Sequence, residues 1–434
     1  MTTSPTSIEI RSYQVGFGDC FLLSFLYPDD VKRHVLIDFG TSELPRGLKP
    51  STHMPRVAED IRKVCGGRLD AVVATHRHLD HISGFATDGT NGQSGTVIAA
   101  CEPTLVLQPW TEDPKAATDA RSATKLPSRS PKTFLLGMSS MHQIAEAVAA
   151  MTTSPPPSMS AALVKQLRFL GETNIKNKSA VTNLIRMGSR KGATAVWARH
   201  GDPSGLDRLL PGVKVHVLGP PDLTQTEAIR TMRSSDPDEF WPLLAGPAGV
   251  RARSVAPLSR ALARRVSATL PPEARWFRDR LEHMSGQQLM EIVTLLDQQM
   301  NNTSLVLLFE VGRKKLLFPG DAQLENWSYA LKDAPASAVA ATRQLIGAVD
   351  VYKVGHHGSR NATPKQMLWM SLKKRGKGRA SPLVTLLSTL PGKHSGVPNP
   401  ALLDALARES ILHNTNKPER DVKGPLGTLV TVKV

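Results

Sequence analysis

Short apolar runs separated by turns fill the first hundred residues of the chain. Four of these runs predict β-strands, by alternation of apolar and polar positions or by continuous apolar character, at residues 8–13, 20–25, 34–40 and 69–74. Residues 56–64 repeat apolar side chains at helical spacing, which predicts an amphipathic helix before the fourth strand. Strands with an intervening helix are typical of an α/β layer architecture.

The rest of the chain continues this pattern around two long segments of different character. Strands are predicted at 104–107, 193–197, 213–218, 304–311, 315–318, 349–354, 383–387 and 429–434, and helices at 138–151 and 401–407. Residues 111–182 contain a polar segment rich in proline, serine and alanine, and they predict an inserted loop and helix. Residues 222–300 carry eight arginines between Arg251 and Arg280 and predict a basic helical insertion. We expect a single domain over residues 1–434 with these two insertions.

A cluster of histidines and an aspartate follows the strand predicted at 69–74. The sequence there is Thr75-His76-Arg77-His78-Leu79-Asp80-His81. Imidazole and carboxylate groups are the usual ligands of zinc and of similar divalent metals. His76 and His78 alternate in an extended loop and can face one ion, while Asp80 and His81 come one turn later and can face a second. A chance cluster of packed or solvated residues is the alternative, and it explains this spacing less well.

Two further polar segments come directly after predicted strands. Pro319-Gly320-Asp321 follows the strand at 315–318, and Gly355-His356-His357-Gly358-Ser359 follows the strand at 349–354. Because adjacent side chains point in different directions, the two histidines are expected to have different roles.

These segments together resemble a known family. The runs VGFGDCFLL, VLIDFG and THRHLDH are similar to the metallo-β-lactamase fold, and the runs NNTSLVLLFEVGRKKLLFPGDAQLENW and DVYKVGHHGSRNATP are similar to the hydrolase domain of ComEC-type competence proteins and their soluble relatives. The resemblance implies an α/β fold, the metallo-β-lactamase αββα sandwich with helical insertions. ComEC-type proteins carry membrane helices, whereas this chain has no apolar run of the ~20 residues that a membrane span needs. An uptake channel is therefore not implied.

The resemblance also implies ligands for two divalent metal ions, Zn²⁺ or Mn²⁺. Asp321 is expected to bridge the ions, with His76 and His78 completing the first site, and with Asp80, His81 and His357 completing the second. Many members of the fold supply a third histidine to the first metal where this chain has Asn301-Asn302, so we expect that site to bind more weakly or to prefer manganese. His200 is a possible substitute, although a loop histidine without this role fits better. We expect His356 to face phosphate or to act as an acid or base, and its role and that of His357 can be exchanged.

Two ions that share a water can lower its pKa to near neutrality and hold the oxygens of an in-line displacement. The expected reaction is hydrolysis by a metal-bridging hydroxide that Asp80 orients. The resemblance favours phosphodiesters, hence a nuclease cleaving DNA or RNA, and so does the charge of residues 353–379, which hold eight lysines or arginines and no acid. Substrate contacts are predicted for Asn302, Ser359, Lys373, Lys374 and Arg375. The alternatives are a small-molecule hydrolase of the same fold, acting on a lactone, thioester or phosphoester, and a binding module whose metal site is structural.

The net charge and the cysteine content of the chain predict its binding partner and its cellular compartment. A formal net charge of +16 suits a polyanionic partner, nucleic acid before an anionic membrane surface, unless it reflects a general compositional bias. The three cysteines are widely spaced, which argues against a disulfide framework and fits a reducing cytosol. We therefore expect a cytoplasmic enzyme with nucleic acid as its substrate and no membrane association, and the sequence leaves its protein partners unknown.

Overall fold

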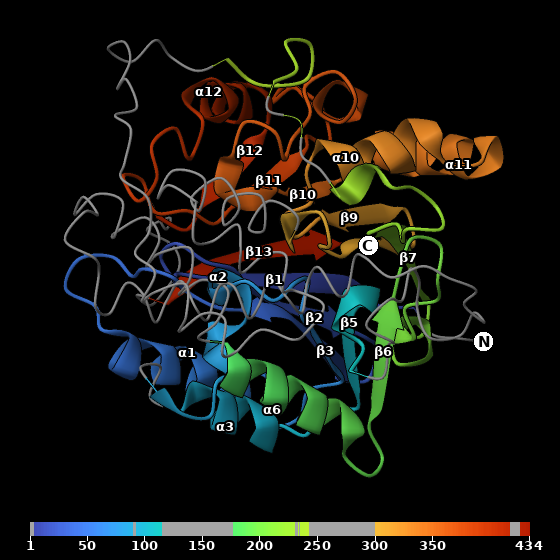
Figure 1. Ribbon diagram of the computed structural model, residues 1–434. Coiled ribbons are helices and arrows are strands. Elements are labelled where there is room, and N and C mark those ends of the chain that lie inside the picture. Colours follow the sequence, from blue (N-terminus) through green and yellow to red (C-terminus); the bar gives the residue numbers. More distant parts are fainter. Residues whose placement is uncertain are drawn as a thin grey trace, which may run out of the picture.

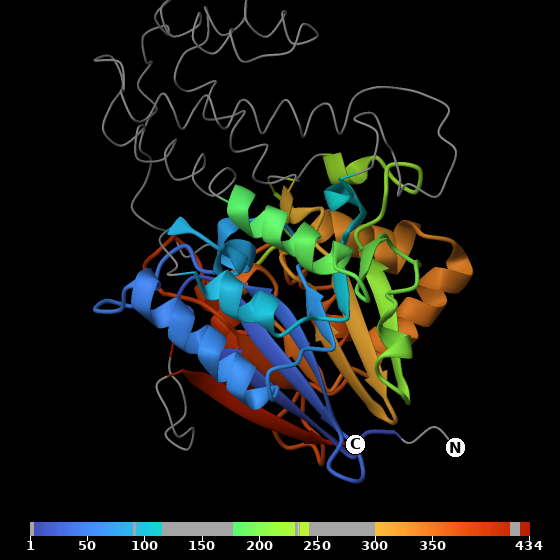
Figure 2. The same ribbon diagram turned by 90° about the horizontal axis from the view of Figure 1, so that it is seen from below.

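The computed structural model describes residues 4–89, 93–114, 177–230, 233, 235–242, 300–416 and 426–434 of the 434 residues. In this part of the chain two β-sheets stack face to face, and helices cover the outer face of each sheet (Figure 1 and Figure 2). This arrangement is the αββα sandwich that the sequence predicts.

The first sheet has seven strands, and most of them come from the first half of the chain. Their order in space is β13 (Gly427–Lys433), β1 (Ser7–Tyr13), β2 (Cys20–Leu26), β3 (Lys32–Phe39), β4 (Ala71–Val73), β5 (Leu105–Pro109) and β6 (Thr194–Ala198). Neighbours from β13 to β3 pair antiparallel, whereas neighbours from β3 to β6 pair parallel. The last strand of the chain completes this sheet beside β1, as predicted.

The second sheet has six strands and comes mostly from the second half of the chain. Their order is β12 (Ile411–Asn414), β11 (Val384–Leu387), β10 (Val351–Lys353), β9 (Lys314–Phe318), β8 (Val306–Val311) and β7 (Val213–Gly219). Strands β8 and β9, both predicted, pair antiparallel as a hairpin, and β9 to β12 run parallel. Because parallel strands end at the same edge of a sheet, the loops after β9, β10 and β11 lie together.

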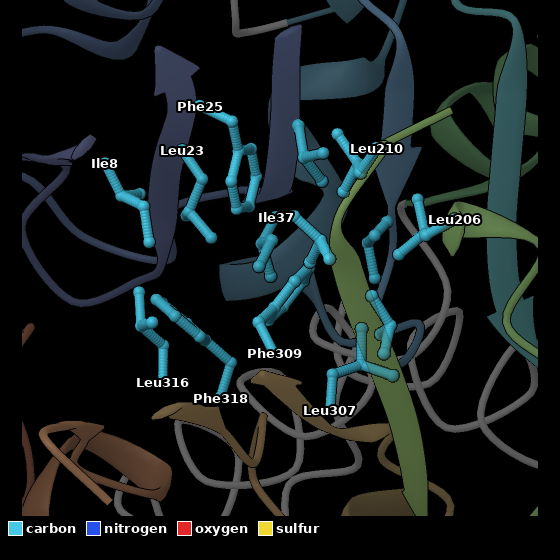
Figure 3. Close-up of a cluster of buried hydrophobic side chains, with 14 of the residues drawn as sticks. Ile8, Leu23, Phe25, Ile37, Leu206, Leu210, Leu307, Phe309, Leu316 and Phe318 are labelled. Carbon is cyan, nitrogen blue, oxygen red and sulfur yellow. The ribbon is translucent and has the colours of Figure 1, made fainter. Parts of the chain in front are cut away.

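The inner faces of the two sheets form the main hydrophobic core (Figure 3). The rings of Phe21 and Phe318 meet across the core with centroids 5.7 Å apart, and those of Phe25 and Phe309 meet at 6.0 Å. Aromatic pairs of this kind contribute roughly 0.5–1.5 kcal/mol each beyond their buried area. The core therefore fixes the two sheets relative to each other and, with them, the loops at their edges.

Among the described residues, helices cover the outer face of each sheet. Helices α1 (Pro50–Val64), α3 (Ser94–Ala100) and α6 (Lys178–Ser189) lie on the first sheet, and α10 (Leu324–Ser328), α11 (Ala336–Gly347) and α12 (Pro400–Glu409) lie on the second. Helix α1 begins at Pro50 rather than at residue 56, because proline is tolerated in a first turn, where its missing N–H needs no partner. Helix α12 begins after Asn399, whose side chain accepts hydrogen bonds from the N–H groups of Ala401 and Leu402.

Most of the two predicted insertions lies outside the described residues, and so does the helix predicted at 138–151. The described part of the second insertion includes Trp241, whose ring meets that of Trp369 with centroids 6.4 Å apart and whose indole N–H donates to the carbonyl of Thr363. None of the helices within the described ranges is long and apolar enough to cross a membrane.

Candidate metal centre

Loops from both sheets meet at one edge of the sandwich. Residues 75–81 follow β4 and lead into α2 (Leu79–Ile82), while residues 320–321 follow β9 and residues 355–359 follow β10. The N–H of Leu305 donates to the carbonyl of Thr75 at 2.9 Å, which ties the two sheets together here. The metal ligands predicted from distant parts of the sequence therefore come from one edge.

The backbone around the histidine pair has an uncommon conformation. The φ angles of His356, His357 and Gly358 are 41°, 51° and 83°. Left-handed backbone costs a non-glycine residue about 1–2 kcal/mol, and such strain concentrates at functional sites. A Cβ at position 358 would lie 2.9 Å from the Cβ of Pro398, so glycine is needed there. The turn gives the two side chains different surroundings, since His357 is fully buried and the side chain of His356 is 26% exposed.

Four buried side chains form the centre of the site. Asp80, His81, Asp321 and His357 bring one ligand atom each to within 4.8 Å of one another. His81 Nε2 lies 3.1 Å from Asp321 Oδ2, and His357 Nε2 lies 3.0 Å from Asp80 Oδ2. Zinc binds nitrogen and oxygen ligands at about 2.0–2.2 Å, so atoms at these separations can contact one ion. These are the four residues that the sequence predicts for the second metal.

His76 and His78 form a pair beside this group. His76 Nε2 and His78 Nδ1 face each other at 3.0 Å, and the ring of His76 packs on that of His81 with centroids 4.2 Å apart. Two nitrogens at that separation can also share an ion. In the part of the chain that the structure describes, His76 and His78 do not form a three-ligand group with Asp321 as compact as the group of four. The predicted first site is therefore the less formed of the two.

Asp38, at the end of β3, holds the back of His81 and is absent from the predicted ligand set. Its Oδ2 accepts a hydrogen bond from His81 Nδ1 at 2.8 Å, and its carboxylate also accepts from the N–H and hydroxyl of Thr75. A carboxylate on the far nitrogen fixes the histidine tautomer that leaves Nε2 as a ligand. A Cβ at Gly40 would lie 2.5 Å from the backbone nitrogen of His81, so glycine permits this close approach. The sequence feature from which this supporting role could have been predicted is the aspartate and glycine at the end of the run VLIDFG.

The donor set fits a divalent ion. Among the described residues, His81 Nε2 is buried without a hydrogen-bond partner. His357 Nδ1 donates to the carbonyl of Ser388 at 3.0 Å, which directs Nε2 toward Asp80. Buried nitrogen and oxygen atoms without partners cost free energy unless a ligand satisfies them. We expect one ion to be held by the group of four, and a second by the histidine pair together with Asp321.

Burial and mutual charge shift the pKa values of these groups. Burial lowers the pKa of His81, but the carboxylates of Asp321 and Asp38 outweigh it and raise that pKa well above its ordinary value. Burial raises the pKa of Asp80, yet the hydrogen bond from His357 and the charge of His81 hold it below the usual range. Burial lowers the pKa of His356 to about 4, so this partly exposed ring is neutral at pH 7. A neutral imidazole can accept a proton, but a pKa of about 4 makes it a weak base at pH 7, so the acid–base role of His356 stays a prediction.

Asn302 and Ser359, two predicted substrate contacts, are buried and make contacts within the protein. The carbonyl of Asn302 accepts from the side chain of Asn326 at 3.0 Å, and its own side chain donates to the carbonyl of Ile229 at 3.5 Å. The hydroxyl of Ser359 donates to the side chain of Asn361 at 3.1 Å. Contact of Asn302 and Ser359 with substrate stays a prediction.

Residues 373–375 of the basic run at 353–379 lie away from the metal ligands, whereas Lys353 of the same run is buried beside Asp321. Lys374 pairs with Asp350 at 2.6 Å, and Asp350 precedes β10, whereas the histidine pair follows the opposite end of that strand. Arg375 pairs with Glu409, and Lys373 shares a surface pocket with both of them. The prediction assumed that residues 373–375 lie near the histidine pair in space because they follow it closely in the sequence. The chain instead returns to the amino ends of β10 and β11, where Leu383 donates to the carbonyl of Lys374.

Comparison with known proteins agrees with this geometry. Residues 13–87 match the family model of the metallo-beta-lactamase superfamily. The chain has the metallo-β-lactamase fold. The matched segment contains Asp38 and the histidine cluster at 76–81, and with the clustered ligands it indicates a metal-dependent hydrolase. No curated protein matches the chain.

The matched segment ends before several of the predicted functional residues. Asp321, His356 and His357 lie beyond residue 87, and so do both runs that are similar to ComEC-type hydrolase domains. That narrower resemblance stays a prediction.

Proposed function

We propose that the chain is a dinuclear metal-dependent phosphodiesterase, a nuclease that cleaves DNA or RNA with Zn²⁺ or Mn²⁺. The observation that carries the proposal is the compact group of Asp80, His81, Asp321 and His357, with the pair His76 and His78 beside it. A closed structural zinc site needs four ligands and one ion. Six potential ligands, one of which is the predicted bridging residue Asp321, suit two ions and an open position.

The residues around the ions have separate tasks in this proposal. Two bound ions would polarise a substrate oxygen and activate a water. Asp80 Oδ2 lies 3.0 Å from His357 Nε2, and Asp80 would orient that water while binding one ion. His356 places Nε2 at 3.7 Å from Asp321 Oδ2, with its side chain partly exposed, so it can reach a substrate and transfer a proton.

The phosphodiester part of the proposal rests on charge and on the sequence resemblance. The net charge of +16 favours a polyanion over a neutral substrate. The ion pairs of Lys374 and Arg375 remove one of the reasons for a nuclease, because these cations lie at the other end of β10. That observation favours the second candidate, a small-molecule hydrolase of the same fold.

The cysteines support a cytoplasmic setting as part of the same proposal. Cys20, Cys65 and Cys101 are free and buried. The sulfur atoms of Cys65 and Cys101 lie 4.0 Å apart. The proposed cytoplasmic setting rests on the small number of cysteines in the sequence and the absence of a CxxC pair.

A panel of substrates tests the nuclease proposal. We expect the purified chain to cut DNA or RNA with added Mn²⁺ or Zn²⁺, to stop with EDTA, and to show a KM that rises steeply with salt as phosphate contacts are screened. The panel includes single- and double-stranded nucleic acid, a lactone, a thioester and a small phosphodiester, each with and without metal.

Three other outcomes would separate the candidates. Hydrolysis of a small ester or lactone without salt dependence, and with no nucleic acid cut under any metal, would replace the nuclease by the small-molecule hydrolase. Metal-dependent hydrolysis of small phosphodiesters alone would support a phosphodiesterase, but its substrate would be a small molecule instead of nucleic acid. Bound metal without hydrolysis of any substrate would favour the binding module.

A further inference from the structure

Lys353, the last residue of β10, is buried directly behind the metal centre. Its side chain is 2% exposed, and its Nζ contacts the carboxylate of Asp19, donates to the carbonyl of Gly320 at 3.2 Å and lies 3.7 Å from Asp321 Oδ1. Burial lowers the pKa of Lys353, but Asp19 and Asp321 outweigh it and raise the pKa above its ordinary value. A buried ammonium is unfavourable unless negative charge compensates it, so the buried position of Lys353 depends on the carboxylates of Asp19 and Asp321.

Asp19 contacts the ligand group from the same side. Its carboxylate oxygens lie 3.7 Å from His81 Nδ1 and 3.7 Å from His357 Nδ1, and its N–H donates to the carbonyl of Asp80 at 2.9 Å. Lys353 adds the contact with Asp321. The Asp19–Lys353 pair therefore lies against all four residues of the group, behind the atoms that would face an ion.

Asp19 also belongs to a second group of possible metal ligands, with Asp38 and His81. The ammonium of Lys353 contacts Asp19 and supplies a positive charge at this group. His81 Nδ1 is engaged by Asp38 at 2.8 Å. A further metal ion is therefore not needed to balance these carboxylates.

The two carboxylate oxygens of Asp321 face different partners. Oδ2 is directed at His81 Nε2, at 3.1 Å, and lies 3.9 Å from His357 Nε2. Oδ1 is directed at Lys353 Nζ and has no hydrogen bond within the described residues. Removing the ammonium would leave Oδ1 without the charge that it faces, and the carboxylate would be free to turn.

We propose that Lys353, held by Asp19, is a positioning residue that fixes Asp321 for metal binding. The inference rests on the metal centre of the proposed function but not on its substrate. Charge repulsion alone gives the opposite expectation, because removing a cation near a metal ion would tighten binding of that ion. Loss of positioning weakens binding by about 10–100-fold, the range typical of residues that support metal ligands. The direction of the change therefore separates the two effects.

The test measures the Zn²⁺ dissociation constant of the metal-free full chain by competition with a chromophoric chelator. We expect Lys353→Met to raise this Kd by about 10–100-fold. Lys374→Met is the matched control, because Lys374 pairs with Asp350 at 2.6 Å at the opposite end of β10. The control should leave the Kd unchanged. The Tm of each metal-free variant is recorded, since both variants lose an ion pair.

The double variant Asp19→Asn/Lys353→Met separates positioning from stability. Replacing both partners leaves no uncompensated carboxylate at position 19, so we expect the Tm to recover relative to Lys353→Met while the Kd stays weak. The double variant also supplies a folded protein if Lys353→Met does not fold. A wild-type or tighter Kd in either variant would overturn the inference. If the wild-type chain itself binds no zinc, the proposed function fails instead.

Discussion

Replacing Asp321 by asparagine is expected to remove metal and hydrolysis together. Asp321 Oδ2 lies 3.1 Å from His81 Nε2 within the group of four, and Asp321 is the residue predicted to bridge the two ions. An amide has no charge to balance two dications. Because bound metal supplies several kcal/mol of transition-state stabilisation, we expect kcat/KM to fall by at least roughly 10²–10³-fold.

The measurement pairs elemental analysis with a hydrolysis assay on the same preparation. Metal content should drop below one equivalent per chain in Asp321→Asn. Asp404→Asn is the control, because Asp404 is an exposed carboxylate on α12 that pairs with Arg408 at 2.9 Å. An Asp321→Asn variant that keeps two ions and full activity would show that Asp321 does not bridge them.

The adjacent histidines are expected to separate metal binding from turnover. His357 is fully buried with Nε2 at 3.0 Å from Asp80 Oδ2, so His357→Ala should lose metal and activity together. His356 is partly exposed and reaches toward Asp321 from outside the group of four. His356→Ala should keep its metal and lower kcat by about 10²–10⁴-fold, as expected for the loss of a general acid or base.

Metal content, kcat and KM of both histidine variants are measured side by side. An unchanged KM in His356→Ala would show that its contribution arises in the transition state. The reverse pattern would exchange the two roles. Normal activity in both variants would mean that the strained turn at 355–359 serves only the fold.

The strands that form the inner core were predictable because their side chains repeat at the spacing of a buried sheet. Ile8 and Ile10 alternate with polar residues along β1, and both are fully buried. Strand β12 was missed because it is short and only partly buried, which leaves no apolar run to detect. Helix α12 was predicted too short, since its first turn depends on the Asn399 cap more than on hydrophobic spacing.

The predicted metal ligands carry a sequence signal of a different kind. His76, His78, Asp80 and His81 lie in one local motif, and Asp321 and His357 lie in short motifs after strands, so each carries its signal in a few neighbouring residues. Supporting residues carry no such signal. Asp19 and Lys353 meet through the packing of two sheets from opposite ends of the chain, and no local pattern encodes that contact.

The basic run illustrates the same limit. Lys373, Lys374 and Arg375 follow the histidine pair closely in the sequence, which made a shared surface plausible. The ion pairs of Lys374 with Asp350 and of Arg375 with Glu409 instead place this segment at the amino ends of the parallel strands. Proximity along a chain says little about proximity in space once the chain reverses direction.

The most direct test of the central claim is the metal content of the wild-type chain. Protein purified without chelator, then reconstituted with Zn²⁺ or Mn²⁺ and freed of excess metal, is analysed for bound metal per chain. We predict more than one equivalent, approaching two, with the ion at His76 and His78 lost first as a chelator is added. A value near zero after reconstitution would contradict a metal-dependent hydrolase built on Asp80, His81, Asp321 and His357.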